Sequence, residues 1–218
     1  MDDVGVRRVL WAGVRVGVIA ALWTLLGGAQ TPGREMEQAQ GVRSPRTTSE
    51  MIAFLEDHSG SPGDWNRLGE MHLMDGQTES ARTAFARAEQ RYVDLATRPP
   101  RSPRDQDPNY IASLWHEIGW LRLERLDDEP GAREAFKEGS EIIDVFIRLS
   151  PMRNPLYNLA CYRAMAGDHD LAIDAFARAI DAGYENHRYA SGDRDLDSLR
   201  DDPRFQQLMA RIDPRRPD

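Results

Sequence analysis

The chain has little cysteine and no excess of basic residues. It contains one cysteine, Cys161, among 218 residues, so an intrachain disulfide and a multi-cysteine metal site are both excluded. Its 28 Lys and Arg residues are outnumbered by 36 Asp and Glu residues, which gives a formal net charge of −8. The basic surface that nucleic-acid binding requires is therefore not expected. With 40% hydrophobic and 29% charged residues, the composition is that of a folded chain.

Motifs of catalysis and of cofactor binding are also missing. The stretch "HEIGW" at His116 begins like the helix of a zinc protease, but Trp120 stands where the second histidine would be needed. The 5 histidines include no pair at metal-ligand spacing, and no glycine-rich phosphate loop or Gly-x-Ser-x-Gly turn occurs. We therefore expect no catalytic residues, no metal and no cofactor, and predict that the chain is not an enzyme.

One apolar run near the N-terminus has the character of a targeting segment. Three arginines, the last of them Arg15, precede an apolar run at 16–29. Its length is that of a signal-peptide core, and Gly27 and Ala29 supply small residues for a cleavage site. A membrane anchor that starts at Val9 is the alternative, with the last arginine near its cytoplasmic end. Both interpretations place the body of the protein across the membrane, either periplasmic or secreted, or anchored to the inner membrane by an N-terminal helix.

Composition and capping signals divide the chain into segments. A polar stretch without periodicity follows the apolar run, and "TTSE" then offers a capping box with Thr47 at the N-cap and Glu50 three residues on. The predicted segments are a signal peptide or N-terminal membrane anchor at 1–29, a flexible spacer at 30–46, a helical repeat domain at 47–192, C-terminal capping helices at 193–213 and a tail at 214–218.

Three similar segments then follow one another. They read "WNRLGEMH" from Trp65, "WHEIGWLR" from Trp115 and "LYNLACYR" from Leu156, and each is followed by a turn and an Ala-x3-Phe pattern. The small residue in the first helix of each unit, which is Gly69, Gly119 or Ala160, would let a second helix approach closely. Glycines at 76 and 167 suit helix C-caps, with Thr78 and Asp168 as N-caps of the next helices.

The pattern resembles the tetratricopeptide repeat (TPR) of bacterial proteins, including the C-terminal segment that closes such arrays. The resemblance implies an all-α fold, an α-solenoid of about three TPR-like helix hairpins with N- and C-terminal capping helices. His72, Arg122 and Arg163 depart from the usual tyrosine of the repeat. Because the spacing between units is longer than the usual period of about 34 residues, we expect long second helices at 78–97 and 132–149.

The acidic stretch "GDRDLDSLRDDPRF" allows two interpretations. Asp193, Asp195 and Asp197 have the alternation of a calcium loop, but Ser198 and Arg204 stand where glycine and a bidentate glutamate are needed. The Asp-Pro helix start and the apolar residues around it favour a cap on the last repeat instead. We expect packing residues at Leu196, Leu199, Phe205, Leu208, Met209 and Ile212.

The resemblance also implies a groove lined by the first helix of each repeat, which holds a protein or peptide partner. The matching positions here are Asn66, Glu70, Leu73, His116, Trp120, Glu124, Asn154, Tyr157 and Met165, with Asn158 next to them. The alternative is that Trp120 and Tyr157 pack between repeats. A second candidate surface is the proline-rich loop at 98–108, whose arginines could present a strip to an acidic partner, although a solvated linker is the simpler interpretation.

These features predict an exported protein–protein interaction scaffold of the bacterial cell envelope that binds a protein or peptide partner in its groove. A regulatory or auxiliary subunit of a larger membrane-associated enzyme complex is the alternative. No nucleic-acid partner is expected, and the membrane would be contacted through the N-terminal segment if that segment stays uncleaved.

Overall fold

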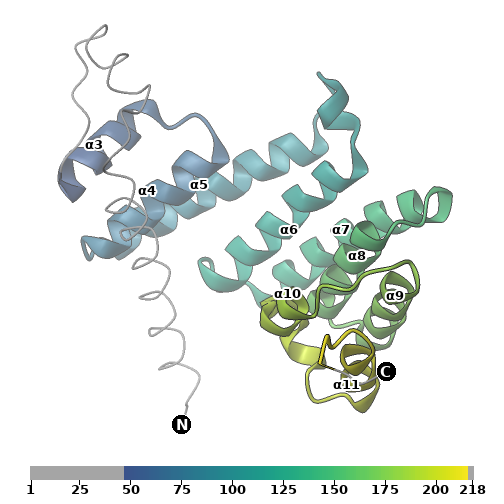
Figure 1. The fold of residues 1–218 in the computed structure, drawn as a ribbon. Coiled ribbons are helices and arrows are strands. Elements are labelled where there is room, and N and C mark those ends of the chain that lie inside the picture. Colours follow the sequence, from purple (N-terminus) through teal and green to yellow (C-terminus); the bar gives the residue numbers. More distant parts are fainter. Residues whose placement is uncertain (1–46, 216–218) are drawn as a thin grey trace, which may run out of the picture. The chain divides into compact units, whose positions relative to one another are not determined.

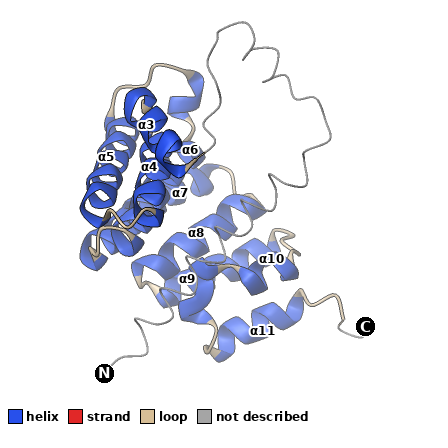
Figure 2. Ribbon diagram, turned by 90° about the vertical axis from the view of Figure 1, so that its left-hand side faces the viewer, coloured by secondary structure: helices blue, strands red, loops and turns tan. Residues whose placement is uncertain are grey.

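The computed structural model describes residues 47–215, and within this part all regular elements are helices (Figures 1 and 2). The predicted signal peptide or anchor and the spacer lie outside the described residues. Among the helices that are described, none has the length and apolar character needed to cross a membrane.

The described part begins with helix α3 (Thr48–His58), which starts at the capping box that the sequence predicts. The Glu50 amide donates to Thr47 Oγ1 at 3.1 Å, and the Thr47 amide donates to Glu50 Oε2 at 3.2 Å. Two of the free amides at the helix start are thereby satisfied. Ile52 and Leu55 are buried and pack in one cluster with residues of the first hairpin. α3 therefore covers the start of the repeat array.

Three helix hairpins follow in the order of the sequence repeats. They pair α4 (Pro62–Met74) with α5 (Thr78–Thr97), α6 (Pro108–Glu124) with α7 (Glu129–Leu149), and α8 (Arg153–Ala166) with α9 (His169–Asp181). Each hairpin packs against the next, through α5 with α6 and through α7 with α8. This consecutive packing is that of an all-α solenoid, as predicted.

The helix boundaries agree with most of the predicted capping. The long helix predicted at 78–97 is confirmed, and the one predicted at 132–149 begins one turn earlier, because Asp128 Oδ1 accepts a hydrogen bond from the Gly131 amide at 3.0 Å. Gly76 and Gly167 have φ of 75° and 93°, the left-handed conformation expected after a helix.

The predicted N-cap of α5 is wrong. Thr78 is the first helical residue, and Gln77 occupies the cap position without a side-chain capping bond. Asp168 does stand at the N-cap of α9, but its side chain makes no capping hydrogen bond. Tertiary packing therefore fixes these two helix starts where a local cap does not.

In the first two hairpins a glycine of the first helix lies directly against a phenylalanine of the second. The pairs are Gly69 with Phe85 and Gly119 with Phe136, and the third hairpin has Ala160 and Phe176 at the corresponding sequence positions. A Cβ atom added at Gly119 would lie 2.6 Å from ring carbons of Phe136, and one added at Gly69 would overlap the Phe85 ring in the same way. The phenylalanine rings are fully buried. The close approach predicted from the small residues is thus present at Gly69 and Gly119.

The chain ends in α10 (His187–Gly192), the 3-10 helix η2 (Arg194–Leu199) and α11 (Pro203–Arg211). Figure 1 shows this segment beside α8 and α9, in agreement with its contacts. Leu196, Leu199 and Phe205 are buried in the same core as Phe176, while Asp202 accepts from the Arg204 amide at 2.8 Å and caps α11. The predicted packing role of the C-terminal segment is confirmed.

Replacing Gly69 by alanine is expected to lower the free energy of unfolding by about 1–3 kcal/mol, because the added Cβ overlaps the Phe85 ring. Gly63→Ala is the matched control in the same helix, since its Cβ would meet only Ser61 Oγ at 3.8 Å. Thermal and urea unfolding followed by circular dichroism compare the two variants. Equal stability of both would contradict the close approach.

Candidate functional site

The structure brings four of the predicted groove residues together around the C-terminal segment. His116, Trp120 and Glu124 are spaced one turn apart along α6, and Tyr157 lies on α8. Residues 193–195, here called the C-terminal strap, follow α10 and include the first two residues of η2, and they contact all four side chains. The strap therefore spans the first helices of the second and third hairpins.

The carboxylate of Asp195 is held by two side chains of α6. The indole nitrogen of Trp120 donates to Asp195 Oδ1 at 3.1 Å, and His116 Nε2 lies 2.8 Å from Asp195 Oδ2. Trp120 Nε1 can only donate, so both carboxylate oxygens are satisfied when the histidine proton is assigned to Nε2. The side chains of His116 and Asp195 are 23% and 14% exposed, which keeps the contact largely shielded from water.

The carboxylate of Asp193 is held from α8. The hydroxyl of Tyr157 donates to Asp193 Oδ2 at 2.6 Å, and the thiol of Cys161 donates to the same oxygen at 3.8 Å. The other oxygen accepts from the Asp195 amide at 3.1 Å. Burial, followed by the neighbouring Cys161 and Asp193, raises the pKa of Tyr157 far above its usual range. The hydroxyl therefore keeps its proton and acts as a donor.

Arg194, between the two acids, makes the third contact of the strap. Its guanidinium lies 4.4 Å from the centre of the Trp120 ring and forms an ion pair with Glu124. A cation over an indole face is attracted by the ring quadrupole. All three consecutive residues of the strap thus engage predicted groove residues.

One group of metal-ligating atoms occurs in the described part of the chain. Cys161, Asp193 and Asp195 offer atoms within 4.8 Å of one another. Burial, together with these two carboxylates, raises the pKa of the Cys161 thiol well above its usual value, which disfavours the thiolate that binds a metal. The calcium-loop geometry does not form, because Asp197 turns outward and pairs with Arg200 at 2.7 Å. The cluster works as a hydrogen-bonded contact between the strap and the hairpins.

The predicted groove residues of the first hairpin make different contacts. Glu70 pairs with Arg125 of the second hairpin at 2.7 Å, and Leu73 is 40% exposed. Asn66 is half-buried, and its buried Oδ1 has no hydrogen-bond partner among the described residues. This part of the predicted groove offers an apolar side chain and an amide.

The remaining predicted residues lie on α8. Asn154 is exposed, while Asn158 and Met165 are half-buried. Tyr157 is buried and stacks on Tyr184, with ring centres 4.4 Å apart and planes 11° apart. Tyr157 therefore packs in the core through its ring, as the packing interpretation expects, and contacts the strap through its hydroxyl.

The loop at 98–108 is a folded connection, and the extended strip that its prolines suggested is wrong. It contains the 3-10 helix η1 (Pro103–Gln106), and Asp105 pairs with Arg98 at 3.3 Å. Arg104 lies 4.2 Å from the centre of the Tyr110 ring. Two of the three arginines are thus turned back onto the protein.

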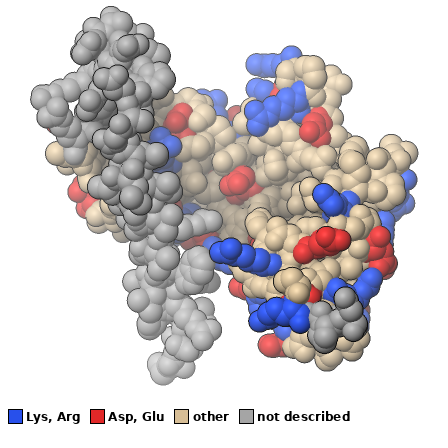
Figure 3. Space-filling view, viewed as in Figure 1, with Lys and Arg blue, Asp and Glu red and all other residues tan. Residues whose placement is uncertain are grey.

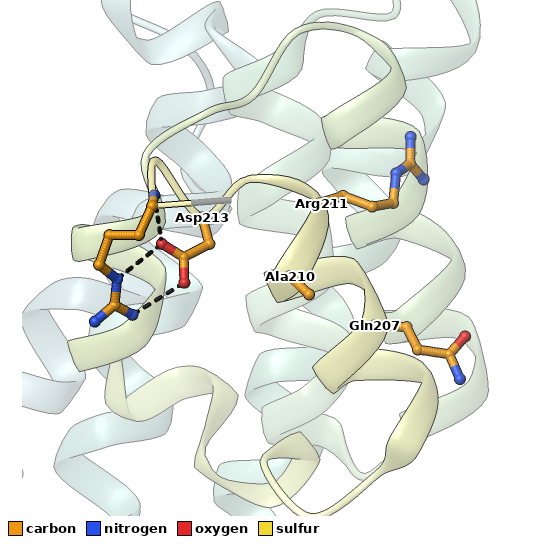
Figure 4. Close-up of a pocket in the computed structure, with 5 residues that line it drawn as sticks. Gln207, Ala210, Arg211 and Asp213 are labelled. Carbon is orange, nitrogen blue, oxygen red and sulfur yellow. Dashed lines mark hydrogen bonds and ion pairs between the residues drawn. The ribbon is translucent and has the colours of Figure 1, made fainter. Parts of the chain in front are cut away.

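A shallow depression beside α11 brings no candidate chemistry (Figure 4). It is lined by Gln207, Ala210, Arg211, Asp213 and Arg215. The hydrogen bonds drawn in Figure 4 join Arg215 to Asp213, and they lower the pKa of the Asp213 carboxyl to about 2. Arg211 pairs with Asp181 of α9 at 2.7 Å. The charges of the depression are therefore engaged with one another or with the last hairpin.

Sequence reasoning missed that the strap fills part of the predicted groove. The signal was present as two acids, Asp193 and Asp195, spaced two residues apart directly after Gly192. Figure 3 shows Lys and Arg side chains interspersed with Asp and Glu on the described part of the face drawn there, rather than one large patch of either sign.

The comparisons with known proteins give little further information. No protein-family model matches the chain, and no curated protein matches it. Among solved structures, one titled "Crystal structure of MamA" is similar at 14% sequence identity and a TM-score of 0.36, covering 74% of this chain and 84% of that chain. A likeness at this level assigns no function to this chain.

Replacing Tyr157 by phenylalanine is expected to lower the free energy of unfolding by about 1–3 kcal/mol, because the half-buried Asp193 carboxylate loses a donor. Tyr189→Phe is the control, since Tyr189 is 59% exposed. Urea unfolding measures both variants. An unchanged midpoint for Tyr157→Phe would show that the strap contributes no stability through this bond.

Proposed function

We propose that the chain is an exported protein-interaction scaffold of tetratricopeptide-repeat type, which binds a segment of a partner protein along the first helices of its hairpins. One observation carries the proposal. The face formed by α6 and α8 holds a peptide segment, the chain's own strap, through side chains at groove positions of the repeat. Short peptide segments, extended or helical, are ligands in several recurring modes of protein recognition.

The open part of this face lies on the first hairpin. Asn66, Glu70 and Leu73 follow one another at helical spacing and therefore share one side of α4. Leu73 supplies exposed apolar area, which a partner segment can bury. The Oδ1 atom of Asn66 is buried and has no hydrogen-bond partner among the described residues. The Glu70–Arg125 ion pair joins this part to the second hairpin.

The sequence of the N-terminal segment supports export. Arginines precede the apolar run at 16–29, an order typical of segments that translocate the following chain. We place the scaffold in the bacterial envelope, periplasmic or secreted, or anchored to the inner membrane if the segment is kept. If the partner is an enzyme of the membrane, the chain is an auxiliary subunit of that complex. The proposal gives the chain itself no catalytic role.

Replacing Leu73 by aspartate is expected to abolish capture of the partner while leaving the melting temperature unchanged, because the side chain is already partly in water. Crosslinking and affinity purification of the tagged full chain from its native envelope measure capture. Leu171→Asp is the control, since Leu171 is 51% exposed on α9, which is a second helix. Partner capture by Leu73→Asp at the wild-type level would remove the first hairpin from the binding face.

Export is tested by fractionation and mass spectrometry of the chain made in a bacterial cell. The expected product lies in the periplasmic or membrane fraction, and a new N-terminus after Ala29 identifies a signal peptide. An uncut chain in the membrane pellet identifies the anchor. A full-length chain confined to the cytoplasm would contradict the envelope assignment.

A further inference from the structure

We propose that the C-terminal strap is an internal substitute for the partner's own segment. The partner binds by placing an acid–base–acid triplet on His116, Trp120, Glu124 and Tyr157, in place of the strap. This inference rests on the proposed function and specifies the kind of partner, which is an acidic segment with a basic residue between two carboxylates.

The donors of the site fit carboxylates rather than other ligands. Trp120 Nε1 is a donor only, and the Tyr157 hydroxyl keeps its proton because burial raises its pKa. With the proton of His116 assigned to Nε2, three N–H or O–H groups converge on two carboxylates two residues apart. Hydrogen bonds to an ionised acceptor are stronger than those between neutral groups. A ligand without carboxylates would leave these buried and half-buried donors poorly paired.

The contact of Arg194 with Trp120 and Glu124 explains why the triplet needs a basic residue between its two acids. When the strap leaves, the ring face of Trp120 and the carboxylate of Glu124 lose the guanidinium of Arg194. A partner segment with two acids and no basic residue would bring negative charge close to the Glu124 carboxylate without a cation to neutralise it. An arginine or lysine between the acids restores the ion pair and the cation–π contact. The site is therefore complementary to the sequence pattern acid–base–acid.

The strap is able to leave the face without opening the core. Its own contacts with the hairpins are polar side-chain contacts, whereas apolar anchoring occurs on either side of it, at Ala190 and Leu196, both fully buried. Gly192 lies between these anchors, and a Cβ there would meet no atom within 4 Å. The Arg200 side chain also donates to the Asp193 carbonyl at 2.8 Å, and this bond must break. Ala190 and Leu196 keep the C-terminal segment packed on the hairpins while the partner segment replaces the strap.

The closing experiment uses the full chain and two synthetic peptides. One peptide carries the chain's own residues 189–198, and the other has asparagine in place of the aspartates that correspond to Asp193 and Asp195. The protein variant D193A/D195A removes the internal carboxylates. Its matched control is E185A/D201A, which removes the same charge from exposed positions on either side of the strap. Fluorescence anisotropy of the labelled peptides measures binding.

We expect D193A/D195A to bind the acidic peptide about tenfold or more tightly than the wild-type chain. The control variant should bind like wild type, and the asparagine peptide should bind neither protein. Circular dichroism checks that each variant is folded. Equal affinity of the wild-type chain and a folded D193A/D195A variant would overturn the inference and make the strap a fixed structural cap.

A second measurement on the unmodified chain covers the case in which D193A/D195A does not fold. Excess acidic peptide should speed amide hydrogen exchange of the strap while α11 keeps its protection. Unchanged exchange of the strap would also overturn the inference. If a partner is captured through Leu73 while no acidic peptide binds, the scaffold function stands and the internal substitute is wrong.

Discussion

The contact between a small residue of the first helix and a phenylalanine of the second determines how each hairpin closes. At Gly69 and Gly119 the facing ring occupies the space that a Cβ atom would need. Because the rings are fully buried, the separation of the two helices is set by backbone against ring rather than by flexible side chains. The third hairpin has Ala160 at the corresponding position, so a Cβ atom is accommodated there, and the Phe176 ring is fully buried as well. α6 and α8 therefore present comparable faces, and the strap uses both of them.

A second set of contacts joins each hairpin to the helix that precedes it. Three positions depart from the usual tyrosine of the repeat, and each reaches back to the helix before its own hairpin. The links are His72 to Glu56 at 3.7 Å, Arg122 to Glu89 at 2.7 Å and Arg163 to Asp144 at 3.2 Å. They join α4 to α3, α6 to α5 and α8 to α7. The residues present here form polar links between each hairpin and the preceding helix. The departures from the repeat pattern thus have a structural role.

Local patterns predicted most of the fold, because helix ends and hairpins are decided within a few residues. The capping box at Thr47, the Asp-Pro start of α11 and the positive φ of Gly76 all follow from neighbouring residues. The contact of the strap could not be predicted in this way. Asp195 meets His116 and Trp120 across 79 and 75 residues of sequence. The sequence pattern of two acids with this spacing is the same whether their side chains face solvent, a metal or an indole. Which of these they face depends on how the hairpins pack.

The acidic stretch shows how backbone geometry separates residues of one type. Asp193 and Asp195 face the hairpins, Asp197 pairs outward with Arg200, and Asp202 caps a helix. The first two accept from the hydroxyl of Tyr157 and the indole of Trp120, respectively, which are neutral donors. Neutral donors attract an acid only at short range and in the correct direction, whereas cations act over a Debye length of roughly 8–10 Å. Selection of an acidic segment by this site therefore depends on the spacing and direction of its carboxylates, and the net charge of −8 discourages acidic chains that lack that arrangement.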